Sequence, residues 1–389
     1  MSEVAEPSSP SVLESLRSHL DGQRVLIVHD WLVAWAGAER CVEQMMRVFP
    51  SADLVVGVLS SKMRPHNALT RRAQETWLGR VPGAREHHRW FLPLEALAFA
   101  TLDTTGYRLV ISSSHAFSKA IRKGPETVHL CYCHSPPRYL WDLAQTYRAD
   151  ASLVQRFALS LGTRPLRAVD RWAARRVDRF VCNSRFVADR IRRIYRRDAE
   201  VIYPPVTAKP WSSEVGRREA FLLSLGRLVP YKRVDLAIAA AERLGVRLVV
   251  AGDGPDRARL ERLGGRWTEF VGEVSEEEAG RLMSSCAAFV FCGEEDFGIA
   301  PVEANAHGVP VVGYGRGGLL ETMREGDTAE FFREQTVDAI AAAIERTLAR
   351  RWDEVALKQN ASRFAPSRFR QALSTEVVRA LEAHTSSGR

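Results

Sequence analysis

The chain contains no run of about 18 apolar residues, so its sequence predicts no transmembrane helix. Its first ten residues, Met1 to Pro10, are acidic and rich in serine and proline. They lack the basic start and apolar middle of a secretory signal. We therefore expect a disordered tail over residues 1–22 and a cytoplasmic protein, with attachment to the inner face of the cytoplasmic membrane left open.

Cysteine is scarce, and its six copies mostly fall inside apolar runs, which predicts buried, reduced thiols. Cys131 and Cys133, followed by His134, suggest metal ligands, but no second cluster follows at zinc spacing. An Asp-x-Asp sequence at a strand end, which could hold a divalent cation, is also missing. The sequence therefore predicts neither a metal nor a resident cofactor.

Acidic residues are rare between Arg164 and Arg197, where twelve arginines accompany three aspartates within a chain of net charge +8. Such a segment could bind nucleic acid or an anionic membrane. The arginines recur at helical spacing without the interleaved aromatic residues that stack on bases, which favours a solvated helix face. We expect no nucleic-acid partner.

Two successive series of short apolar strands alternate with helical segments. The first series comprises residues 24–30, 54–59, 109–114, 128–133 and 180–184, and the second comprises 221–225, 246–251, 270–271, 288–291 and 309–312. Pro204-Pro205 separates them as a hinge. This pattern predicts an α/β protein with two Rossmann-like, doubly wound parallel sheets, which bind ligand outside the carboxyl ends of the strands, in the cleft between the two halves.

We place the first domain at residues 23–205 and the second at residues 206–365. The remaining residues, 366–389, are expected to form a helix that packs back on the first domain.

Two glutamates, Glu295 and Glu303, stand eight positions apart around a small turn. The turn follows a predicted strand and precedes a predicted helix, so the amides of residues 297–300 lie at a helix N-terminus that attracts anions. A carboxylate on each side of an anion site suits a ligand with phosphate in its middle and hydroxyls at both ends. A nucleotide-sugar is such a ligand, although similar junctions also occur without a function.

Basic and polar side chains follow other predicted strands. Gly226-Arg227 and Lys232 follow the first strand of the second series, where a guanidinium and an ammonium could hold a diphosphate or could simply be surface cations. His134 begins a Pro-Pro turn after the fourth strand, and Gly37 follows the first strand, where a backbone could approach a ligand closely.

Taken in order, these residues resemble glycosyltransferase family 4, the retaining enzymes with the GT-B fold. Residues 295–303 resemble its E-x7-E signature, and Gly226-Arg227 with Lys232 resemble its diphosphate-binding pair. Residues 252–255 and 271–274 add to a similarity that spans nearly the whole chain beyond residue 24. The resemblance implies a nucleotide-sugar donor bound by the second domain, an acceptor bound by the first, and two domains facing a central cleft.

Carried over to these positions, the resemblance implies specific roles. Arg227 and Lys232 neutralise the diphosphate, Glu295 holds a hydroxyl of the donor sugar, and His134 contacts that sugar. Glu303 accepts the ribose hydroxyls. The resemblance implies further donor-binding positions at Gly37, Gly226, Gly272, Val274, Phe297, Gly298, Ile299 and Ala300.

A narrower resemblance lies in residues 111–117 and 131–142, which are similar to bacterial mannosyl- and rhamnosyltransferases of O-antigen or exopolysaccharide synthesis. Those enzymes mostly use GDP-sugars. One departure is Ala36, which stands where the family usually has glycine, and which would disturb the turn only if its φ angle were positive.

The acceptor implied by this resemblance is a saccharide linked to a polyprenyl diphosphate. Residues 85–94 are basic and aromatic and run into an apolar stretch, so they suit either an anionic membrane surface or the start of a core helix. A nucleotide-sugar epimerase of GT-B fold, or a transferase using a UDP-sugar, remains an alternative.

Overall fold

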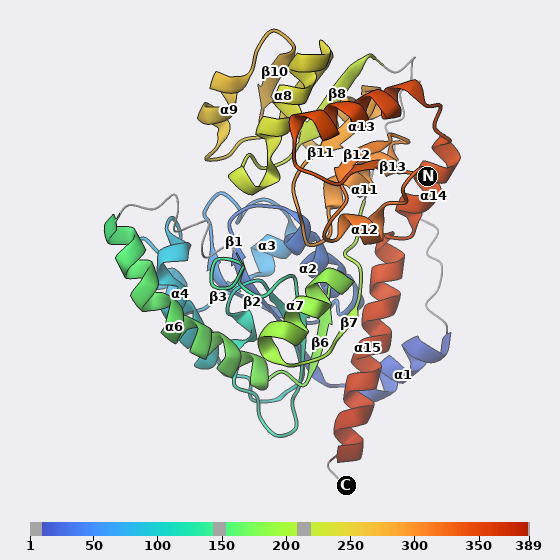
Figure 1. The fold of residues 1–389 in the computed structure, drawn as a ribbon. Helices are drawn as coiled ribbons and strands as arrows, with labels where there is room; N and C mark the ends of the chain where they lie inside the picture. Colours follow the sequence, from blue (N-terminus) through green and yellow to red (C-terminus); the bar gives the residue numbers. More distant parts are fainter. Residues whose placement is uncertain (1–9, 143–152, 208–218, 388–389) are drawn as a thin grey trace. The chain divides into compact units, whose positions relative to one another are not determined.

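The computed structural model describes residues 10–142, 153–207 and 219–387, and it divides the chain into two compact units (Figure 1). Unit 1 consists of Met1–Pro205 and Pro366–Arg389, and unit 2 consists of Val206–Ala365. Each unit is built around one parallel sheet covered by helices, as the two series of apolar strands predict.

Unit 1 contains seven strands among the described residues, in the order β3-β2-β1-β4-β5-β6-β7. Every pairing is parallel, with Ile27 of β1 opposite Leu54 on one side and Ile111 on the other. The strands are β1 (Arg24–Leu32), β2 (Asp53–Leu59), β3 (Gln74–Glu75), β4 (Tyr107–Ser114), β5 (Val128–Cys133), β6 (Arg179–Cys182) and β7 (Ala199–Val201). The two-residue strand β3 was not predicted, because it carries no apolar run.

Helices cover both faces of this sheet. They are α1 (Pro10–Leu20), α2 (Gly37–Val48), α3 (Ala68–Arg72), α4 (Leu92–Ala100), α6 (Leu153–Arg175), α7 (Arg185–Tyr195) and α15 (Pro366–Ser387), with short 3₁₀ turns η1 (Trp77–Arg80), η2 (His88–Phe91) and η3 (Ser118–Ala120). The last helix, α15, buries Phe369, Leu373 and Leu381 in the same core as Ile27 of β1. It therefore belongs to unit 1, although 160 residues of unit 2 precede it.

The predicted disordered tail over residues 1–22 is wrong for its second half. Residues 10–20 form α1, which lies beside α15 (Figure 1) and buries Leu16 in the unit 1 core. The acidic, serine- and proline-rich composition that suggested disorder is confined to the first ten residues, and residues 1–9 lie outside the described part of the chain.

Unit 2 contains six strands among its described residues, again all parallel, in the order β10-β9-β8-β11-β12-β13. They are β8 (Phe221–Leu225), β9 (Arg247–Ala251), β10 (Thr268–Gly272), β11 (Ala288–Phe291), β12 (Val311–Tyr314) and β13 (Ala329–Phe332). We expected the series to end at residue 312, but β13 pairs with β12 along residues 329–332.

Eight helical segments are described in unit 2. They are η4 (Pro230–Lys232), α8 (Val234–Leu244), α9 (Arg257–Leu263), α10 (Glu276–Ser285), α11 (Ile299–Ala306), α12 (Leu319–Thr322), α13 (Val337–Ala349) and α14 (Glu354–Ser362).

The strand orders identify where each sheet can bind a ligand. In both units the order runs outward in opposite directions from two central strands, β1 and β4 in unit 1 and β8 and β11 in unit 2. Chains leaving the carboxyl ends of such neighbours diverge, and the opening between them is the usual binding position of doubly wound sheets. The predicted fold class is thereby confirmed, and the loops after these four strands become the candidate site.

Candidate active site

The chain ends of β8, β9 and β10 in unit 2 are held together by backbone hydrogen bonds that glycines donate. The amide of Gly226 donates to the carbonyl of Ala251 at 3.0 Å, and the amide of Gly252 donates to the carbonyl of Gly272 at 2.6 Å. All three glycines have positive φ angles, of 140°, 128° and 74°. A Cβ atom at Gly252 would overlap the carbonyl oxygen of Gly226, so glycine is required there.

Lys232 lies at the opening between β8 and β11. It ends the 3₁₀ turn η4, and with Arg227 and Gly226 it lines a small pocket whose floor includes Val290 of β11. A Cβ at Gly293 would lie 2.9 Å from the Cα of Lys232, so the loop after β11 packs directly on this turn. Arg227 is exposed at the same rim. Both predicted cations are therefore brought together at the carboxyl edge.

Glu295 faces Lys232 across this opening. Its Oε1 atom lies 3.2 Å from the Lys232 ammonium nitrogen, and both side chains are about one-fifth exposed, at 24% and 20%. The same Oε1 atom is shielded from solvent and accepts no hydrogen bond from any described residue. A buried carboxylate oxygen that keeps a free lone pair can accept a hydroxyl donor from a ligand.

The N-terminus of α11 is open to a ligand. The helix begins at Ile299, one residue earlier than predicted, after Gly298 with a φ angle of 85°, and no side chain caps it. Ile299 and Ala300 are half-buried, and their amides belong to the first turn, which has no intrahelical acceptors. Gly318 donates to the carbonyl of Glu295 at 2.8 Å, which fixes the loop leading to this helix.

The other predicted donor-binding positions in unit 2 differ in what they present. Phe297 is buried, and its ring packs edge-on against Phe364 at 5.2 Å, so its side chain is a core residue and only its backbone faces the loop. Glu303 lies half-buried in the second turn of α11. Gly272 and Val274 lie at the end of β10, with Gly272 buried and Val274 half-buried.

In unit 1, His134 follows β5 and is held by three hydrogen bonds. Its Nε2 atom lies 2.8 Å from Oγ of Ser113, its amide donates to the carbonyl of Ser114, and its carbonyl accepts from the side-chain amide of Asn183. Burial, followed by the charges of His115 and His29, lowers the pKa of His134 well below its ordinary value. His134 is therefore a neutral imidazole with a fixed ring.

Gly37 begins helix α2, and the preceding Ala36 has an extended backbone with φ of −142°. Alanine adopts that conformation without strain, so the departure from the family's glycine leaves the turn intact. The amide of Ala36 donates to Oε2 of Glu39 at 2.9 Å, which anchors the start of the helix.

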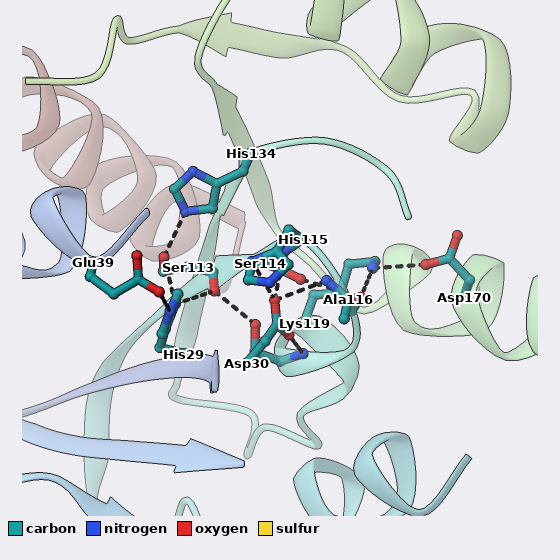
Figure 2. A network of polar contacts seen from close by, with 11 residues as sticks. His29, Asp30, Glu39, Ser113, Ser114, His115, Ala116, Lys119, His134 and Asp170 are labelled. Carbon is teal, nitrogen blue, oxygen red and sulfur yellow. Dashed lines mark hydrogen bonds and ion pairs between the residues drawn. The ribbon is translucent and has the colours of Figure 1, made fainter. Parts of the chain in front are cut away.

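A network of buried charged side chains at the unit 1 edge was not predicted (Figure 2). His29 and Asp30 stand near the carboxyl end of β1, within a strand that otherwise reads as apolar. The Asp30 carboxylate accepts three backbone hydrogen bonds, from His115 at 2.6 Å, Ala116 at 2.8 Å and Ser118 at 2.6 Å. Asp30 thus fixes the loop after β4.

The pKa of Asp30 is consistent with these hydrogen bonds. Burial would raise the pKa of Asp30, but the charges of His115 and His29 and the backbone donors lower it overall. His115 lies 3.2 Å from Asp30, and burial nevertheless lowers its pKa. The only sequence signal for this network was a histidine and an aspartate inside an apolar run, because charged residues in a buried strand need partners.

A second buried ion pair supports the same loop. Lys119 lies 2.7 Å from Asp170 of α6, and both are almost fully buried. Asp170 also accepts hydrogen bonds from Tyr195 and Trp141, so its oxygens are occupied. These contacts hold the chain around residues 116–120 in place, and they give Lys119 and Asp170 a structural role.

The charges that suggested a polyanion partner are largely used within unit 1. Arg167 and Arg171 each lie 4.8 Å from the centre of the Trp141 ring, and Arg193 pairs with Asp142 at 2.6 Å. Arg179 pairs with Glu376 of α15 at 2.7 Å. These arginines hold helices and loops to one another, as a structural interpretation of the segment expects.

Helix α4 has a buried face and an exposed apolar face. Leu92, Ala96 and Phe99 are buried. Trp90 just before the helix is 80% exposed, and Leu94 and Leu97 are 37% and 50% exposed. The segment contributes to the core and also presents apolar side chains to the surface, and its contact with a membrane stays a prediction.

Two family models match consecutive parts of the chain. The model for Glycosyltransferase Family 4 matches residues 35–209, and the model for Glycosyl transferases group 1 matches residues 206–364. The chain belongs to glycosyltransferase family 4. The division between the matched regions lies at the boundary between the two structural units.

Curated relatives match parts of the chain. Glycogen synthase of Mycobacterium tuberculosis is 31% identical over 234 residues, which cover 56% of this chain and 55% of that protein. Human alpha-1,3/1,6-mannosyltransferase ALG2 is 25% identical over 286 residues, covering 64% of this chain and 65% of that protein. The chain thus spans about half to two thirds of the length of these relatives.

Solved structures match over nearly the whole chain. Sucrose-phosphate synthase of Thermosynechococcus elongatus has a TM-score of 0.64 at 20% identity, covering 94% of this chain and 98% of that one. Anabaena HepE, in complex with UDP and glucose, has a TM-score of 0.63 at 17% identity, covering 91% and 99%. These similarities establish the GT-B fold of this family 4 member.

Among the described residues, no helix is long and apolar enough to cross a membrane. No group of three or more His, Cys, Asp or Glu side chains in the described ranges could hold a metal ion, and all six cysteines are buried and free.

Proposed function

We propose that this protein is a retaining hexosyltransferase that moves mannose, or a rhamnose-type sugar, from a GDP-sugar to a lipid-linked saccharide in cell-surface polysaccharide synthesis. The observation that carries the proposal is the pairing of Lys232 with Glu295 beside the open N-terminus of α11. A cation, a carboxylate with a free lone pair and unsatisfied amides meet the needs of a sugar joined to a diphosphate.

The proposal gives each part of this edge a role, as the family resemblance implies. Lys232 and Arg227 neutralise the diphosphate, and the amides of residues 298–300 bind its oxygens. Glu295 accepts a hydroxyl of the sugar, and Glu303 accepts the ribose hydroxyls. A donor diphosphate competes with Glu295 for the ammonium of Lys232, so binding of the donor exchanges one anionic partner of the lysine for another.

The proposed reaction needs neither a metal nor another resident cofactor. The bond between the anomeric carbon and the phosphate oxygen breaks, and the phosphate takes the electron pair while the two cations and the helix N-terminus stabilise its charge. The acceptor hydroxyl attacks the same face of the short-lived oxocarbenium ion, and the leaving phosphate takes its proton. His134 contacts the sugar from unit 1, and Gly37 allows a close approach to the phosphate.

Two carboxylates at the unit 1 edge, Asp30 and Glu39, support a mechanism without a covalent glycosyl-enzyme. Asp30 is saturated by three backbone donors, and Glu39 is occupied by His29 and the amide of Ala36. Retaining hydrolases use a carboxylate as the nucleophile that attacks the sugar, and these two carboxylates are already engaged by protein donors. Mass spectrometry of the enzyme during turnover is expected to show no sugar adduct, and trapping one would contradict this mechanism.

A donor panel tests the proposal. Thermal shift in the presence of GDP-, UDP- and dTDP-sugars is expected to show the largest stabilisation with GDP-mannose or a GDP-linked deoxyhexose. Stabilisation by UDP-sugars alone favours the UDP-sugar transferase. Consumption of the donor without any acceptor favours an epimerase of the same fold.

The acceptor is proposed to be a polyprenyl-diphosphate-linked saccharide, reached by peripheral attachment to the cytoplasmic face of an anionic membrane. Trp90, Leu94 and Leu97 support this, because exposed apolar side chains at helical spacing insert into the interface of a bilayer. Arg80 is exposed at the end of the neighbouring η1 turn and adds positive charge.

Co-sedimentation with liposomes tests the membrane contact. Binding should increase with the fraction of anionic lipid and should fall in a Trp90→Ser/Leu97→Ser variant. Leu348→Ser is the control, because Leu348 is an exposed leucine on α13 of unit 2. Binding that ignores lipid charge, or that falls equally in the control, argues against the contact.

A further inference from the structure

Four side chains from four elements of unit 1 form a continuous row that ends at His134 (Figure 2). Glu39 of α2 lies 3.5 Å from Nε2 of His29 on β1. Nδ1 of His29 lies 3.1 Å from both the carbonyl oxygen and Oγ of Ser113 on β4. Oγ of Ser113 lies 2.8 Å from Nε2 of His134, after β5.

We infer that Glu39, His29 and Ser113 are positioning residues, which fix the tautomer and orientation of His134 for the donor sugar. The inference rests on the proposed function, in which His134 contacts that sugar. It adds three residues, none of which touches the substrate, and it assigns the proton on each nitrogen of the row.

The protons follow from the acceptors that each ring faces. Nδ1 of His29 faces a backbone carbonyl, which only accepts, so this nitrogen carries a proton. Nε2 of His29 makes no hydrogen bond among the described residues, but it lies 3.5 Å from the Glu39 carboxylate, whose charge favours a proton on this nitrogen as well. His29 is therefore an imidazolium. Burial opposes this charge, but Glu39 and then Asp30 raise the pKa of His29 above its ordinary value.

The orientation of Ser113 transmits this state to His134. Because His29 donates toward Oγ of Ser113, the hydroxyl proton of Ser113 is directed to Nε2 of His134. A neutral His134 that accepts at Nε2 carries its proton on Nδ1. This leaves Nδ1–H as a donor for a sugar hydroxyl or a phosphate oxygen, in a ring that cannot rotate without breaking the row.

Glu39, at the end of the row opposite His134, also holds the turn before Gly37, which is the other predicted donor contact of unit 1. Oε2 of Glu39 accepts the amide of Ala36, directly before Gly37. One carboxylate therefore fixes both the turn at residues 36–37 and, through His29 and Ser113, the ring of His134. Both points have to be placed correctly when the donor binds.

Other titratable groups also face His29. They are Asp30, Glu39, His115, His134 and, behind His115, Lys119. Of these, Glu39 contributes most to keeping His29 protonated. Removing its charge while keeping its shape is thus the sharpest change available.

The test uses the full-length enzyme with Glu39→Gln, and Glu43→Gln as the matched control. Glu43 lies one turn further along α2 and pairs with Arg47 at the surface. We expect Glu39→Gln to lower kcat about tenfold or more with the donor KM within about twofold, and to move the alkaline limit of kcat to lower pH by about one unit. The control should match wild type in all three.

Two-dimensional ¹⁵N NMR of labelled histidines supplies a readout that does not depend on activity. His134, assigned by its absence in His134→Gln, is expected as the Nδ1–H tautomer in the donor-free enzyme and as a mixture of tautomers in Glu39→Gln. A purely structural role for Glu39 would lower the unfolding temperature while leaving the alkaline limit and the tautomer unchanged, and that result would overturn the inference. A wild-type kcat in Glu39→Gln would overturn it too.

Failure of the proposed function gives a different result from failure of this inference. If no GDP-sugar binds or reacts, the donor assignment is wrong whatever the tautomer. If the donor reacts but His134 carries its proton on Nε2 in the wild-type enzyme, the positioning role of Glu39, His29 and Ser113 is wrong while the proposed function stands.

Discussion

The two carboxyl edges build their sites by different means. In unit 2, the edge is made mainly from backbone, with glycine loops packed on one another, a helix without a side-chain cap, and two basic side chains at the rim. In unit 1, the edge is made from buried side chains. Asp30 binds the backbone of the loop after β4, and the row from Glu39 to His134 links four side chains. The difference matches what each edge is proposed to do.

A diphosphate carries its own charge and needs many donors from any direction, which backbone amides and basic side chains supply. A sugar at its reacting carbon needs a single group held in one orientation, which a buried network supplies at the cost of desolvating its charges. The comparison therefore predicts that changes at the unit 2 edge act on binding of the leaving group, and changes at the unit 1 edge act on orientation.

The largest expected effect is at Lys232. Lys232→Ala removes the cation closest to Glu295 and should lower turnover by about 10²- to 10³-fold, with little change in unfolding temperature because the side chain is part-exposed. Lys358→Ala on α14, which removes an exposed lysine paired with Glu354, is the control. Wild-type turnover in Lys232→Ala would remove the lysine from the site.

The next effect tests whether backbone packing builds the unit 2 edge. Gly252→Ala places a Cβ against the carbonyl of Gly226 at a φ angle of 128°, so it should cost roughly 2–4 kcal/mol in urea unfolding and weaken nucleotide binding. Gly326→Ala is the matched variant, since its φ is 80° but its nearest neighbour is the end of a flexible arginine. If both variants lost the same free energy of unfolding, the strain of a positive φ angle alone would explain the loss, and contact with the carbonyl of Gly226 would not.

A smaller effect on stability is expected at a buried carboxyl of unit 1 that, unlike Asp30, Glu39 and Asp170, has no partner in the described part of the chain. Glu95 of α4 is its exception, because it is 1% exposed and neither oxygen has a hydrogen-bond partner among the described residues. Burial, and then the charge of Asp30, raise the pKa of Glu95 well above its usual value. The folded protein therefore holds this carboxyl in its neutral form.

Glu95→Met should consequently raise the free energy of unfolding at pH 7 by roughly 1–3 kcal/mol. The folded pKa is raised, so the wild-type side chain loses stability as pH rises above the unfolded value of about 4.3. The gain from methionine should thus shrink as pH falls toward 4. A gain independent of pH would mean that packing, and not protonation, explains it.

The smallest effect concerns Ala36. Because its backbone is extended, Ala36→Gly should leave turnover within about twofold of wild type and change unfolding by no more than about 0.5 kcal/mol. A large gain in activity would show that the alanine does restrict the turn when the donor binds.

The sequence predicted the unit 2 edge better than the unit 1 edge, for a physical reason. Glu295 and the start of α11 stand within one short loop after β11, and Lys232 stands in the loop after β8, so the local pattern around each strand end places them. His29 and Asp30 act through partners 84 to 88 residues away, in strand β4 and the loop after it, and only the sheet order brings these together.

Other errors were local. Strands β3, β7 and β13 were missed because they are short and carry a glutamate each. The tail was extended too far because composition over the first ten residues was applied to the helix that follows. The assignment of Phe297 to the donor site concerns its backbone and stays a prediction, since its aromatic ring is buried against Phe364.

Calorimetric titration of GDP tests the central claim most directly, since GDP carries the diphosphate but no transferred sugar. If the unit 2 edge binds the leaving group and the unit 1 edge orients the sugar, Lys232→Ala should weaken GDP binding at least about tenfold, or 1.4 kcal/mol, while His134→Gln stays within about twofold of wild type. Equal weakening by both substitutions, or none in Lys232→Ala, would contradict this division of roles.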